Sequence, residues 1–321
     1  MTSFHEFSKL FEEKFNVRHF PDAPASLYDP AQYILSLGGK RIRPVMCLMG
    51  NELVNNLNPD TWHVATAIEL FHNFTLIHDD IMDKAPLRRG METVHHKYGE
   101  ATALLAGDVM LVVAYDYVNK INKDYLQKVM RLFNRTAKEV CEGQQLDMDF
   151  EKRETVSFDE YVTMIELKTS VALAASLQLG AILGGAGEGN QKHLYEFGKN
   201  LGIAFQVQDD YLDAFGDPDK FGKKVGGDIL ANKKTFLLIH AMEAATAGQL
   251  KELEKLSKAE DSDKVEKVLQ IYKDTKVDAW ANELKEKYFA KAMHHLEEIA
   301  ILSARKKPLQ ELAEYLINRE K

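Results

Sequence analysis

Apolar residues recur along this chain at helical spacing, and long tracts contain no residue that would break a helix. Between Ser3 and Phe15, the phenylalanines and Leu10 fall on one helical face. Prolines remove a backbone donor and clash with the preceding turn, and they are absent from 87–217 and from 219–307. The strand signal, short alternating β-branched runs joined by Asn-Gly or Asp-Gly turns, is weak. The pattern therefore predicts an all-α protein.

The same pattern sets the expected boundaries. Breaks are expected at the proline-containing stretch 21–30, at Gly38-Gly39, at 58–60, at Pro86, at 184–189 and at 216–218. A helical tail follows from 248, with loops near Asp261 and Pro308. No low-complexity linker divides the chain, so we expect a single domain over 1–321. The expected helices are 3–15, 31–37, 44–53, 61–84, 99–121, 123–150, 158–183 and 191–215.

Composition narrows the class of protein. The 321 residues include 41 Lys and Arg against 49 Asp and Glu, a net charge of −8, with 45% hydrophobic residues. This balance is typical of a soluble globular protein and argues against nucleic-acid binding, which favours a basic surface. Two cysteines and an N-terminus without an apolar signal region favour a reducing cytoplasm. The uncharged segment 169–187 contains serine, glutamine and glycine, so we interpret it as a buried helix rather than a transmembrane span.

Two acidic motifs with identical spacing carry the strongest chemical signal. Each is an Asp-Asp-x-x-Asp sequence on an apolar helix, so its first and last carboxylates share one face. Buried carboxylates need compensating charge, and oxygen ligands without His or Cys suit Mg²⁺, which bridges to substrate phosphates. The sequence therefore predicts a site for several divalent ions and a polyanion. The two motifs are Asp79-Asp80-Ile81-Met82-Asp83 and Asp209-Asp210-Tyr211-Leu212-Asp213.

Basic segments accompany both motifs. Each alone is typical of a solvated surface patch, but together with the acidic motifs they predict phosphate binding, because Arg and Lys bind phosphate oxygens. One of them precedes an expected helix N-terminus, which is a natural anion site. The segments are Gly38-Gly39-Lys40-Arg41-Ile42-Arg43-Pro44, Arg88-Arg89-Gly90, Lys168-Thr169, Gly222-Lys223-Lys224 and Lys233-Lys234-Thr235.

These motifs together resemble the short-chain trans-isoprenyl diphosphate synthases of the polyprenyl synthetase family. The matched region runs from Gly38 to Thr235 and also includes Gly143-Gln144 and Gln206. The resemblance implies an isoprenoid synthase fold, a helical bundle around a central cavity, and a homodimer. It implies Mg²⁺-dependent head-to-tail condensation of isopentenyl diphosphate with an allylic diphosphate. The allylic diphosphate ionises to a carbocation, and the products are an all-trans prenyl diphosphate and pyrophosphate.

The resemblance also assigns roles to residues. Three Mg²⁺ ions with substrate bound are implied, held by Asp79, Asp83 and Asp209, with Asp80, Asp210 and Asp213 in the same metal site as further acids. Arg88, Lys168 and Lys223 would bind the allylic diphosphate, and Lys233 is a further substrate-binding residue. Lys40, Arg43, His72 and Arg89 would bind isopentenyl diphosphate, although a His on an apolar helix is more often a core residue. Thr169 and Gln206 would lie beside the allylic cation, as catalytic residues with Lys168 and Lys223.

The resemblance also links the length of the product to the residues that precede the first acidic motif. In the family the growing tail enters an apolar tunnel beneath this motif, and bulky residues form its floor. Phe74 and Thr75 lie five and four residues before Asp79, and Phe71 lies one turn earlier. An aromatic residue at this place, without an insertion in the motif, resembles C20-forming synthases, and Phe71 is a candidate block at C15. We expect products of C15 to C20 rather than long quinone side chains.

Three positions depart from the common family pattern, all in loops or beside them. Asn232 stands where Gly is frequent, Leu237 where Pro is frequent, and Glu92 where Pro is common. None removes an expected ligand of a metal or phosphate, so they concern local geometry.

Three other interpretations stay open on the sequence. A class I terpene cyclase shares the first motif, but it usually has an Asn/Ser/Glu-type second motif and lacks the Gly-Gly-Lys loop. A metal phosphohydrolase would use His78-Asp79 and would need further His ligands, for which His95, His96 and His240 are poorly spaced. An inactive subunit of a heteromeric synthase would retain the fold, but the intact acidic motifs argue against it.

Overall fold

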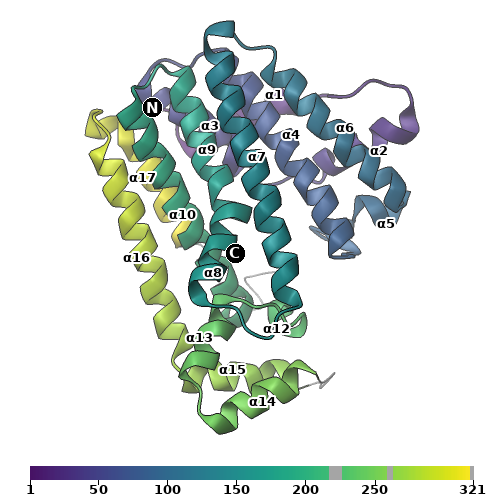
Figure 1. The fold of residues 1–321 in the computed structure, drawn as a ribbon. Helices are drawn as coiled ribbons and strands as arrows, with labels where there is room; N and C mark the ends of the chain where they lie inside the picture. Colours follow the sequence, from purple (N-terminus) through teal and green to yellow (C-terminus); the bar gives the residue numbers. More distant parts are fainter. Residues whose placement is uncertain (217–225, 259–262, 319–321) are drawn as a thin grey trace. The chain divides into compact units, whose positions relative to one another are not determined.

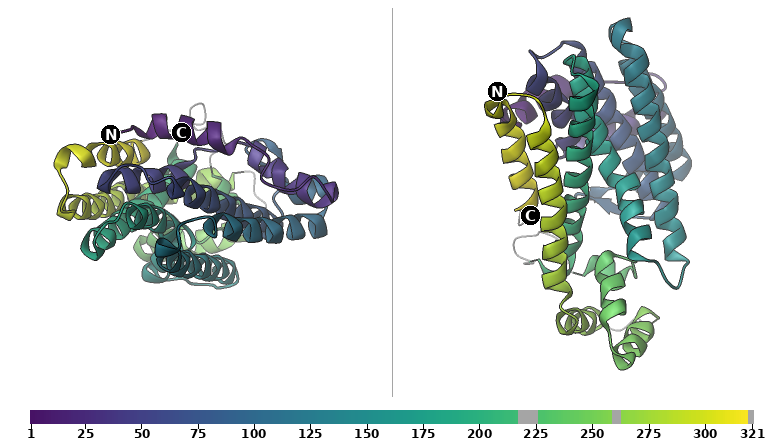
Figure 2. Two further views of the ribbon diagram at one scale, coloured as in Figure 1. Left: turned by 90° about the horizontal axis from the view of Figure 1, so that it is seen from above. Right: turned by 60° about the vertical axis from the view of Figure 1, so that its left-hand side comes forward.

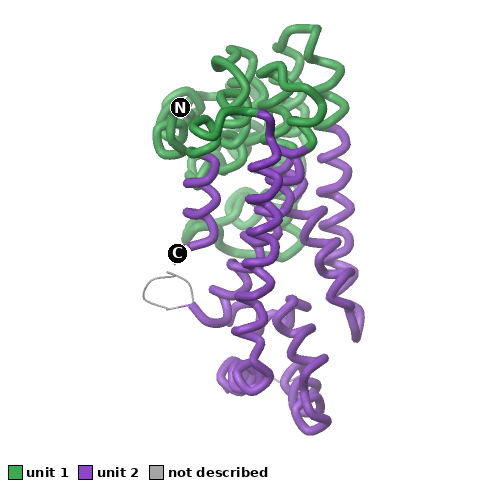
Figure 3. Tube along the Cα trace, turned by 90° about the vertical axis from the view of Figure 1, so that its left-hand side faces the viewer, with its two compact units in different colours: residues 1–133, 175–192, 301–308 green, residues 134–174, 193–300, 309–321 purple. Residues whose placement is uncertain are grey.

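The computed structural model describes residues 1–216, 226–258 and 263–318 (Figure 1). Helices account for most of this described part, and the only strands in it form a two-stranded hairpin. The all-α prediction is confirmed. The described chain falls into two compact units (Figure 3): unit 1 comprises 1–133, 175–192 and 301–308, and unit 2 comprises 134–174, 193–300 and 309–321. The expectation of one domain over 1–321 stays a prediction.

Unit 1 is built mainly from the N-terminal helices. Helix α4 packs along α6 and α3, while α1 packs against α3, and α2 and α5 pack against α6 (Figures 1 and 2). Ser3 and Glu6 form a capping box that begins α1, and the phenylalanines of α1 face inward. The helices are α1 (Phe4–Phe15), α2 (Ala25–Ser36), α3 (Ile42–Val54), α4 (Asp60–Met82), α5 (Val94–Tyr98) and α6 (Glu100–Val118).

Unit 2 contains the remaining shorter helices around its own apolar core. Tyr161, Ile203, Phe236 and Tyr272 belong to this core. Helices α12, α13 and α14 all pack against α15 (Figure 2). The helices are α8 (Phe158–Ile165), the π-helical turn η1 (Glu166–Ser170), α12 (Gly227–Leu230), α13 (Phe236–Ala244), α14 (Ala247–Ser257), α15 (Lys264–Asp274) and α16 (Val277–Glu298).

Four helices contain a boundary between the units. In each, the boundary falls within continuous helical backbone. The expected boundaries 123–150, 158–183 and 191–215 are matched to within a few residues, with 158–183 formed by α8, η1 and α9 in succession. The four helices are α7 (Lys123–Glu151), α9 (Val171–Leu183), α10 (Glu188–Phe215) and α17 (Ser303–Ile317).

A short hairpin follows α4, and the weak strand signal did not predict it. Strands β1 (Leu87–Arg88) and β2 (Met91–Glu92) pair antiparallel. The two residues between them, Arg89 and Gly90, both have positive φ, 54° and 77°. Positive φ at both central residues matches the tight hairpin turns whose twist suits antiparallel strands. The Arg-Arg-Gly sequence therefore serves this turn as well as supplying charge.

Two prolines that were expected to mark loops lie inside helices. Pro30 is within α2, which begins at Ala25 rather than 31, and Pro308 is within α17. A single proline costs one backbone hydrogen bond, and packing of the surrounding residues offsets that loss. In α17, Leu309, Leu312 and Leu316 are buried. The expected loop near Asp261 lies outside the described residues.

Two helical stretches are long and apolar enough to cross a membrane by length and composition alone. They are Glu100–Val118, which is 33% buried in its most apolar window, and Phe158–Leu183, which is 67% buried. Core helices of globular proteins pass the same test, and the second stretch agrees with the buried helix expected there.

Helices α3 and α9 cross closely within unit 1 because both have glycine at the crossing. A Cβ atom on Gly180 would lie 1.9 Å from the Cys47 carbonyl oxygen, and one on Gly50 would lie 2.4 Å from the Leu177 carbonyl oxygen. Neither backbone can move aside cheaply, since both are buried in helices.

We predict that Gly180→Ala destabilises the protein by about 1–3 kcal/mol or more, because the methyl group forces the helices apart. Gly189→Ala is the matched control, since a Cβ there meets nothing within 4 Å. It should leave the denaturant midpoint unchanged or raise it slightly. Equal midpoints for the two variants in urea unfolding would contradict the close crossing.

Candidate functional site

The first acidic motif ends α4, and its three carboxylates have different surroundings. Asp79 is half-buried and Asp83 is exposed, whereas Asp80 is buried with 2% exposure. Arg88 binds Asp80 with a bidentate fork, with its Nη2 at 2.7 Å and its Nε at 2.9 Å from the carboxylate oxygens. The middle carboxylate is therefore held by the protein, and the outer two are less buried.

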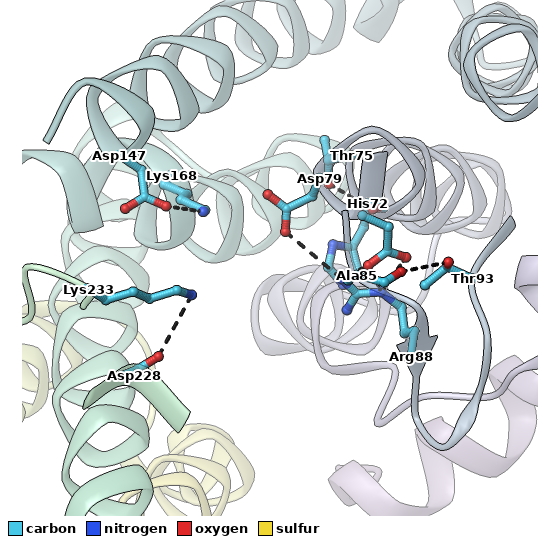
Figure 4. Close-up of polar contacts among 11 residues, drawn as sticks. His72, Thr75, Asp79, Ala85, Arg88, Thr93, Asp147, Lys168, Asp228 and Lys233 are labelled. Atoms are coloured by element: carbon cyan, nitrogen blue, oxygen red, sulfur yellow. Dashed lines mark hydrogen bonds and ion pairs between the residues drawn. The ribbon is translucent and has the colours of Figure 1, made fainter. Parts of the chain in front are cut away.

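The hairpin brings Arg88 to this motif. The Thr93 hydroxyl donates to the Ala85 carbonyl at 2.7 Å and closes the base of the hairpin (Figure 4). Arg88 also lies 3.9 Å from Asp79. Burial opposes the charge of Arg88, but the hydrogen bond and charge of Asp80 raise the pKa of its guanidinium. Arg88, which we expected at the allylic diphosphate, thus anchors the first acidic motif.

Arginines surround His72 in unit 1. The Arg43 guanidinium lies 3.2 Å from His72 Nε2, and since arginine only donates, this nitrogen accepts. Burial first, and then the charges of Arg43, Arg89, Arg88 and Arg41, hold the pKa of His72 well below its ordinary value. His72 is therefore neutral at physiological pH, beside a concentration of positive charge.

Only some of these arginines have their charge balanced by a carboxylate. Glu69 pairs with the buried Arg41 at 2.5 Å, and Asp80 pairs with Arg88. Within the described part of the chain, no ion pair joins a carboxylate to Arg43 or Arg89. Two guanidinium groups and a neutral imidazole next to them form a ready site for an anion.

The Gly-Gly-Lys loop reaches this site by an unusual backbone path. Gly38, Gly39 and Arg41 all have positive φ, at 74°, 149° and 51°. Glycine adopts these conformations freely, which explains the pair of glycines. Arg89 donates to the Gly38 carbonyl, so the loop and the hairpin are joined. Arg43 and Arg89 thus lie near His72, and Lys40 is exposed on the loop. The assignment of these four residues to one substrate stays a prediction.

The second acidic motif, on α10, also has a buried middle carboxylate between two less buried ones. Asp210 is buried with 5% exposure, while Asp209 and Asp213 are half-buried. The Tyr161 hydroxyl donates to Asp210 at 2.6 Å, and the Gln206 amide donates at 2.8 Å. Burial, with the charge of Asp228, raises the pKa of Asp210 to about 7 against these hydrogen bonds. Gln206, expected beside the allylic cation, thus also holds a carboxylate.

Asp213 ties the motif to the segment that follows the undescribed residues. Its carboxylate accepts the Asp228 N–H at 3.0 Å, and its carbonyl accepts the Gly226 N–H at 2.7 Å. A Cβ on Gly227 would lie 3.1 Å from the Asp213 carboxylate. Asp213 therefore has a structural role at the start of α12 as well as its expected role as a supporting acid.

Lys168 and Thr169 lie on a π-helical turn, η1, between α8 and α9. Such turns occur frequently at functional sites because they displace side chains from the regular helical path. The Lys168 ammonium donates to Asp147 on α7 at 2.6 Å. A Cβ on Gly143 would lie 2.2 Å from the Lys168 backbone nitrogen, so this glycine admits the turn. Thr169 is half-buried.

Lys233 follows α12 on a sharply turned backbone. Its ammonium lies 3.7 Å from Asp228, and in Figure 4 it projects to the same side of unit 2 as Lys168. Asn232 has φ 54°, which explains why glycine is frequent there, and asparagine tolerates this conformation better than most residues. Lys223, expected at the allylic diphosphate, lies outside the described residues.

The residues expected to limit product length lie on α4, before the first motif. Phe74 packs edge-on against His78 at 4.8 Å between ring centroids. Phe71 contacts both Phe74 and Phe133. The Thr75 hydroxyl donates to the His72 carbonyl at 2.7 Å. The aromatic residues form a bulky cluster on the apolar part of α4.

The carboxylates fit Mg²⁺ rather than a metal caged by protein. No three His, Cys, Asp or Glu side chains gather as a metal site among the residues that the structure describes. Mg²⁺ keeps several waters and takes one or two carboxylates together with substrate phosphates. Two outer carboxylates one helical turn apart, as at Asp79 and Asp83, suit that mode of binding.

Several residues that shape the site gave no clear sequence signal. The one weak signal concerned Asp147, which lies one helical turn after Gly143 and therefore shares its helical face. In the sequence, Tyr161 resembles an ordinary core residue and Glu69 an ordinary surface residue. Only the folded structure shows that Tyr161 contacts Asp210 and that Glu69 contacts Arg41.

Comparison with known proteins agrees with these motifs. The polyprenyl synthetase family model matches residues 24–275. A geranylgeranyl diphosphate synthase of Methanosarcina mazei is 44% identical over 222 residues, 68% of each chain. A geranylgeranyl pyrophosphate synthase of Geoglobus acetivorans is 38% identical over 316 residues, 98% of this chain and 97% of the relative.

The fold has a similar counterpart among solved structures. A crystal structure of a geranylgeranyl pyrophosphate synthase matches all of both chains with a TM-score of 0.95 and 43% identity. The likeness therefore covers the fold, the motif region and the flanking helices. The chain belongs to the polyprenyl synthetase family, as a prenyltransferase of the short-chain trans-isoprenyl diphosphate synthase type.

Proposed function

We propose that this protein condenses isopentenyl diphosphate head-to-tail with an allylic diphosphate, in a Mg²⁺-dependent reaction. The observation that carries the proposal is the shared construction of the two acidic motifs. In each, protein donors hold the buried middle carboxylate, while the outer two are less buried. This construction suits carboxylates that take up ions only together with a phosphorylated substrate.

Asp79, Asp83 and Asp209 are the proposed Mg²⁺ ligands, for three ions in the substrate complex. Bound Mg²⁺ would neutralise the negative charge that develops on the leaving pyrophosphate. Asp213 supports the second motif, and Asp80 and Asp210 orient their neighbours through the contacts with Arg88 and with Tyr161 and Gln206.

Cationic side chains are proposed to bind the allylic diphosphate. Lys168 and Lys233 each lie beside one carboxylate, Asp147 and Asp228, which fixes the position of the ammonium group. Arg88 is fixed in the same way by Asp80. Lys223 completes the proposed set. Cations fixed in advance stabilise a leaving group without reorganisation during the reaction.

The second substrate, isopentenyl diphosphate, is assigned to Lys40, Arg43, Arg89 and His72. The neutral His72 accepts from Arg43 and so orients this guanidinium, and Arg89 is fixed by the Gly38 carbonyl. The geometry supports an anion here, because Arg43 and Arg89 each retain donors for phosphate oxygens.

The chemistry needs no protein nucleophile. The allylic C–O bond breaks and its electron pair leaves with pyrophosphate, which produces an allylic cation. The double bond of isopentenyl diphosphate attacks this cation, and a proton then passes to the released pyrophosphate. The Thr169 hydroxyl and the Gln206 amide oxygen are proposed to stabilise the cation with their dipoles.

The proposed product range is C15 to C20, and the names of the relatives support C20. We also propose a cytoplasmic homodimer. The outer face of α6 supports the dimer, because Leu104, Leu105 and Val112 are exposed together on one helix.

The purified chain alone should form C15 or C20 prenyl diphosphate from isopentenyl diphosphate and C5, C10 or C15 primers with Mg²⁺. Chelation should abolish product formation, and Asp79→Asn should lower the rate by roughly 10²-fold or more, because a metal ligand is lost. Asp278→Asn, in the first turn of α16 and outside both acidic motifs, is the control and should retain the wild-type rate. Absence of product with every primer would favour the inactive-subunit interpretation instead.

His72 should report binding at the isopentenyl diphosphate site. In the free protein burial and the arginines depress its pKa, so an added anion should raise that pKa, and Arg43→Gln should raise it without any ligand. Two-dimensional NMR of the imidazole during pH titration, with and without inorganic pyrophosphate, measures both effects. Arg135→Gln in unit 2 is the control. A His72 pKa that stays fixed at saturating pyrophosphate would exclude this site.

Phe74→Ala should lengthen the product, because it removes bulk from the proposed tunnel floor, and Phe71→Ala should do the same to a smaller extent. Phe4→Ala, at the partly exposed start of α1, provides the control. Chromatographic sizing of the products after complete conversion is the measurement. Unchanged product length in both Phe74→Ala and Phe71→Ala would overturn the floor assignment.

A further inference from the structure

A buried lysine in unit 2 has no place in the proposed chemistry. Lys264 begins α15 and is only 5% exposed. Its ammonium donates to the side-chain oxygen of Asn232 at 2.6 Å. In the described residues no carboxylate forms an ion pair with it. Burial of a charge against one neutral acceptor is costly, so this contact calls for an explanation.

Asn232 is the residue immediately before Lys233, and its backbone is at a sharp turn. Its φ of 54° lies in the left-handed region. The backbone N–H groups of Asn232 and Lys233 donate to the carbonyls of Ile229 and Asp228. The side chain of Asn232, through its bond with Lys264, thus anchors the turn that presents Lys233. A glycine at this position would have no side chain to do so.

The same segment is anchored at its other end by the second acidic motif. Asp213 accepts the backbone N–H of Asp228, whose carboxylate lies 3.7 Å from the Lys233 ammonium. Residues 226–235 are therefore held at two points, by α10 at the beginning and by Lys264 of α15 near Lys233. Apolar walls from Leu253, Leu256 and Val268 line the pocket that contains Lys264 and Asn232. Lys264 is only 5% exposed, so water has little access to its ammonium, whereas Asn232 is exposed.

We propose that Lys264 is a positioning residue for the allylic substrate: its bond to Asn232 fixes the turn that presents Lys233 to the diphosphate. The inference rests on the proposed function, because it takes Lys233 as a ligand of that diphosphate. Lys264 itself does not touch substrate. Loss of the anchor leaves Lys233 present but able to sample other positions, so affinity falls through the cost of ordering it.

The test uses the full chain with Lys264→Met, Asn232→Gly and the double variant. Methionine keeps the apolar stem without a buried charge, and glycine keeps the left-handed turn without the acceptor. Each single variant should raise the Kd for geranyl diphosphate, measured calorimetrically with Mg²⁺ and without isopentenyl diphosphate, about three- to tenfold. The double variant should show no further rise, since both changes remove one contact.

Lys273→Met, an exposed lysine on the same helix, is the matched control and should bind as wild type does. The KM for isopentenyl diphosphate and the melting temperature should stay close to wild type in Lys264→Met. Unchanged geranyl diphosphate affinity, equal loss for both substrates or additive effects in the double variant would each overturn the proposal. Absence of product from the wild-type chain would instead refute the proposed function.

Discussion

Each acidic motif of this synthase depends on the burial of its middle carboxylate. A buried carboxylate is stable only when donors satisfy it, and the fold provides them in two different ways. Asp80 receives a charged, bidentate partner in Arg88, whereas Asp210 receives two neutral donors, Tyr161 and Gln206. Burial, with the charge of Asp228, raises the pKa of Asp210 to about 7 against these two neutral donors. In both motifs the held carboxylate fixes the last turns of the helix and therefore the direction of its outer neighbours.

A second consequence concerns the distribution of charge in unit 1. Two of the arginines near His72 have their charge balanced by Glu69 and Asp80, and these pairs hold the loop and hairpin in place. Arg43 and Arg89 keep donors for an anion. The neutral His72 helps here because a protonated imidazole would repel Arg43 rather than accept from it. Neighbouring arginines thus divide into Arg41 and Arg88, which form ion pairs within the protein, and Arg43 and Arg89, the proposed anion-binding groups.

Sequence patterns predicted the helices well where apolar periodicity was long and proline absent, as for α4 and α10. They failed at Pro30 and Pro308, because packing outweighs one lost hydrogen bond, and at the hairpin, which is too short for a periodic signal. Candidate site residues with distinctive spacing, such as Asp79 and Asp83, could be proposed from the sequence. Their supports, Tyr161, Asp147 and Lys264, were not, because their partners are distant in sequence and only folding brings them into contact.

The most direct test of this account is the Mg²⁺ dependence of product formation in two neighbouring variants, Asp209→Asn and Asp210→Asn. The account predicts that Asp209→Asn needs a much higher Mg²⁺ concentration for half-maximal rate, because a metal ligand is lost. Asp210→Asn should keep the wild-type Mg²⁺ dependence even where its maximal rate falls, because asparagine retains an acceptor for Tyr161. An equally large shift in the half-maximal Mg²⁺ concentration for Asp210→Asn would contradict the division between held and metal-binding carboxylates.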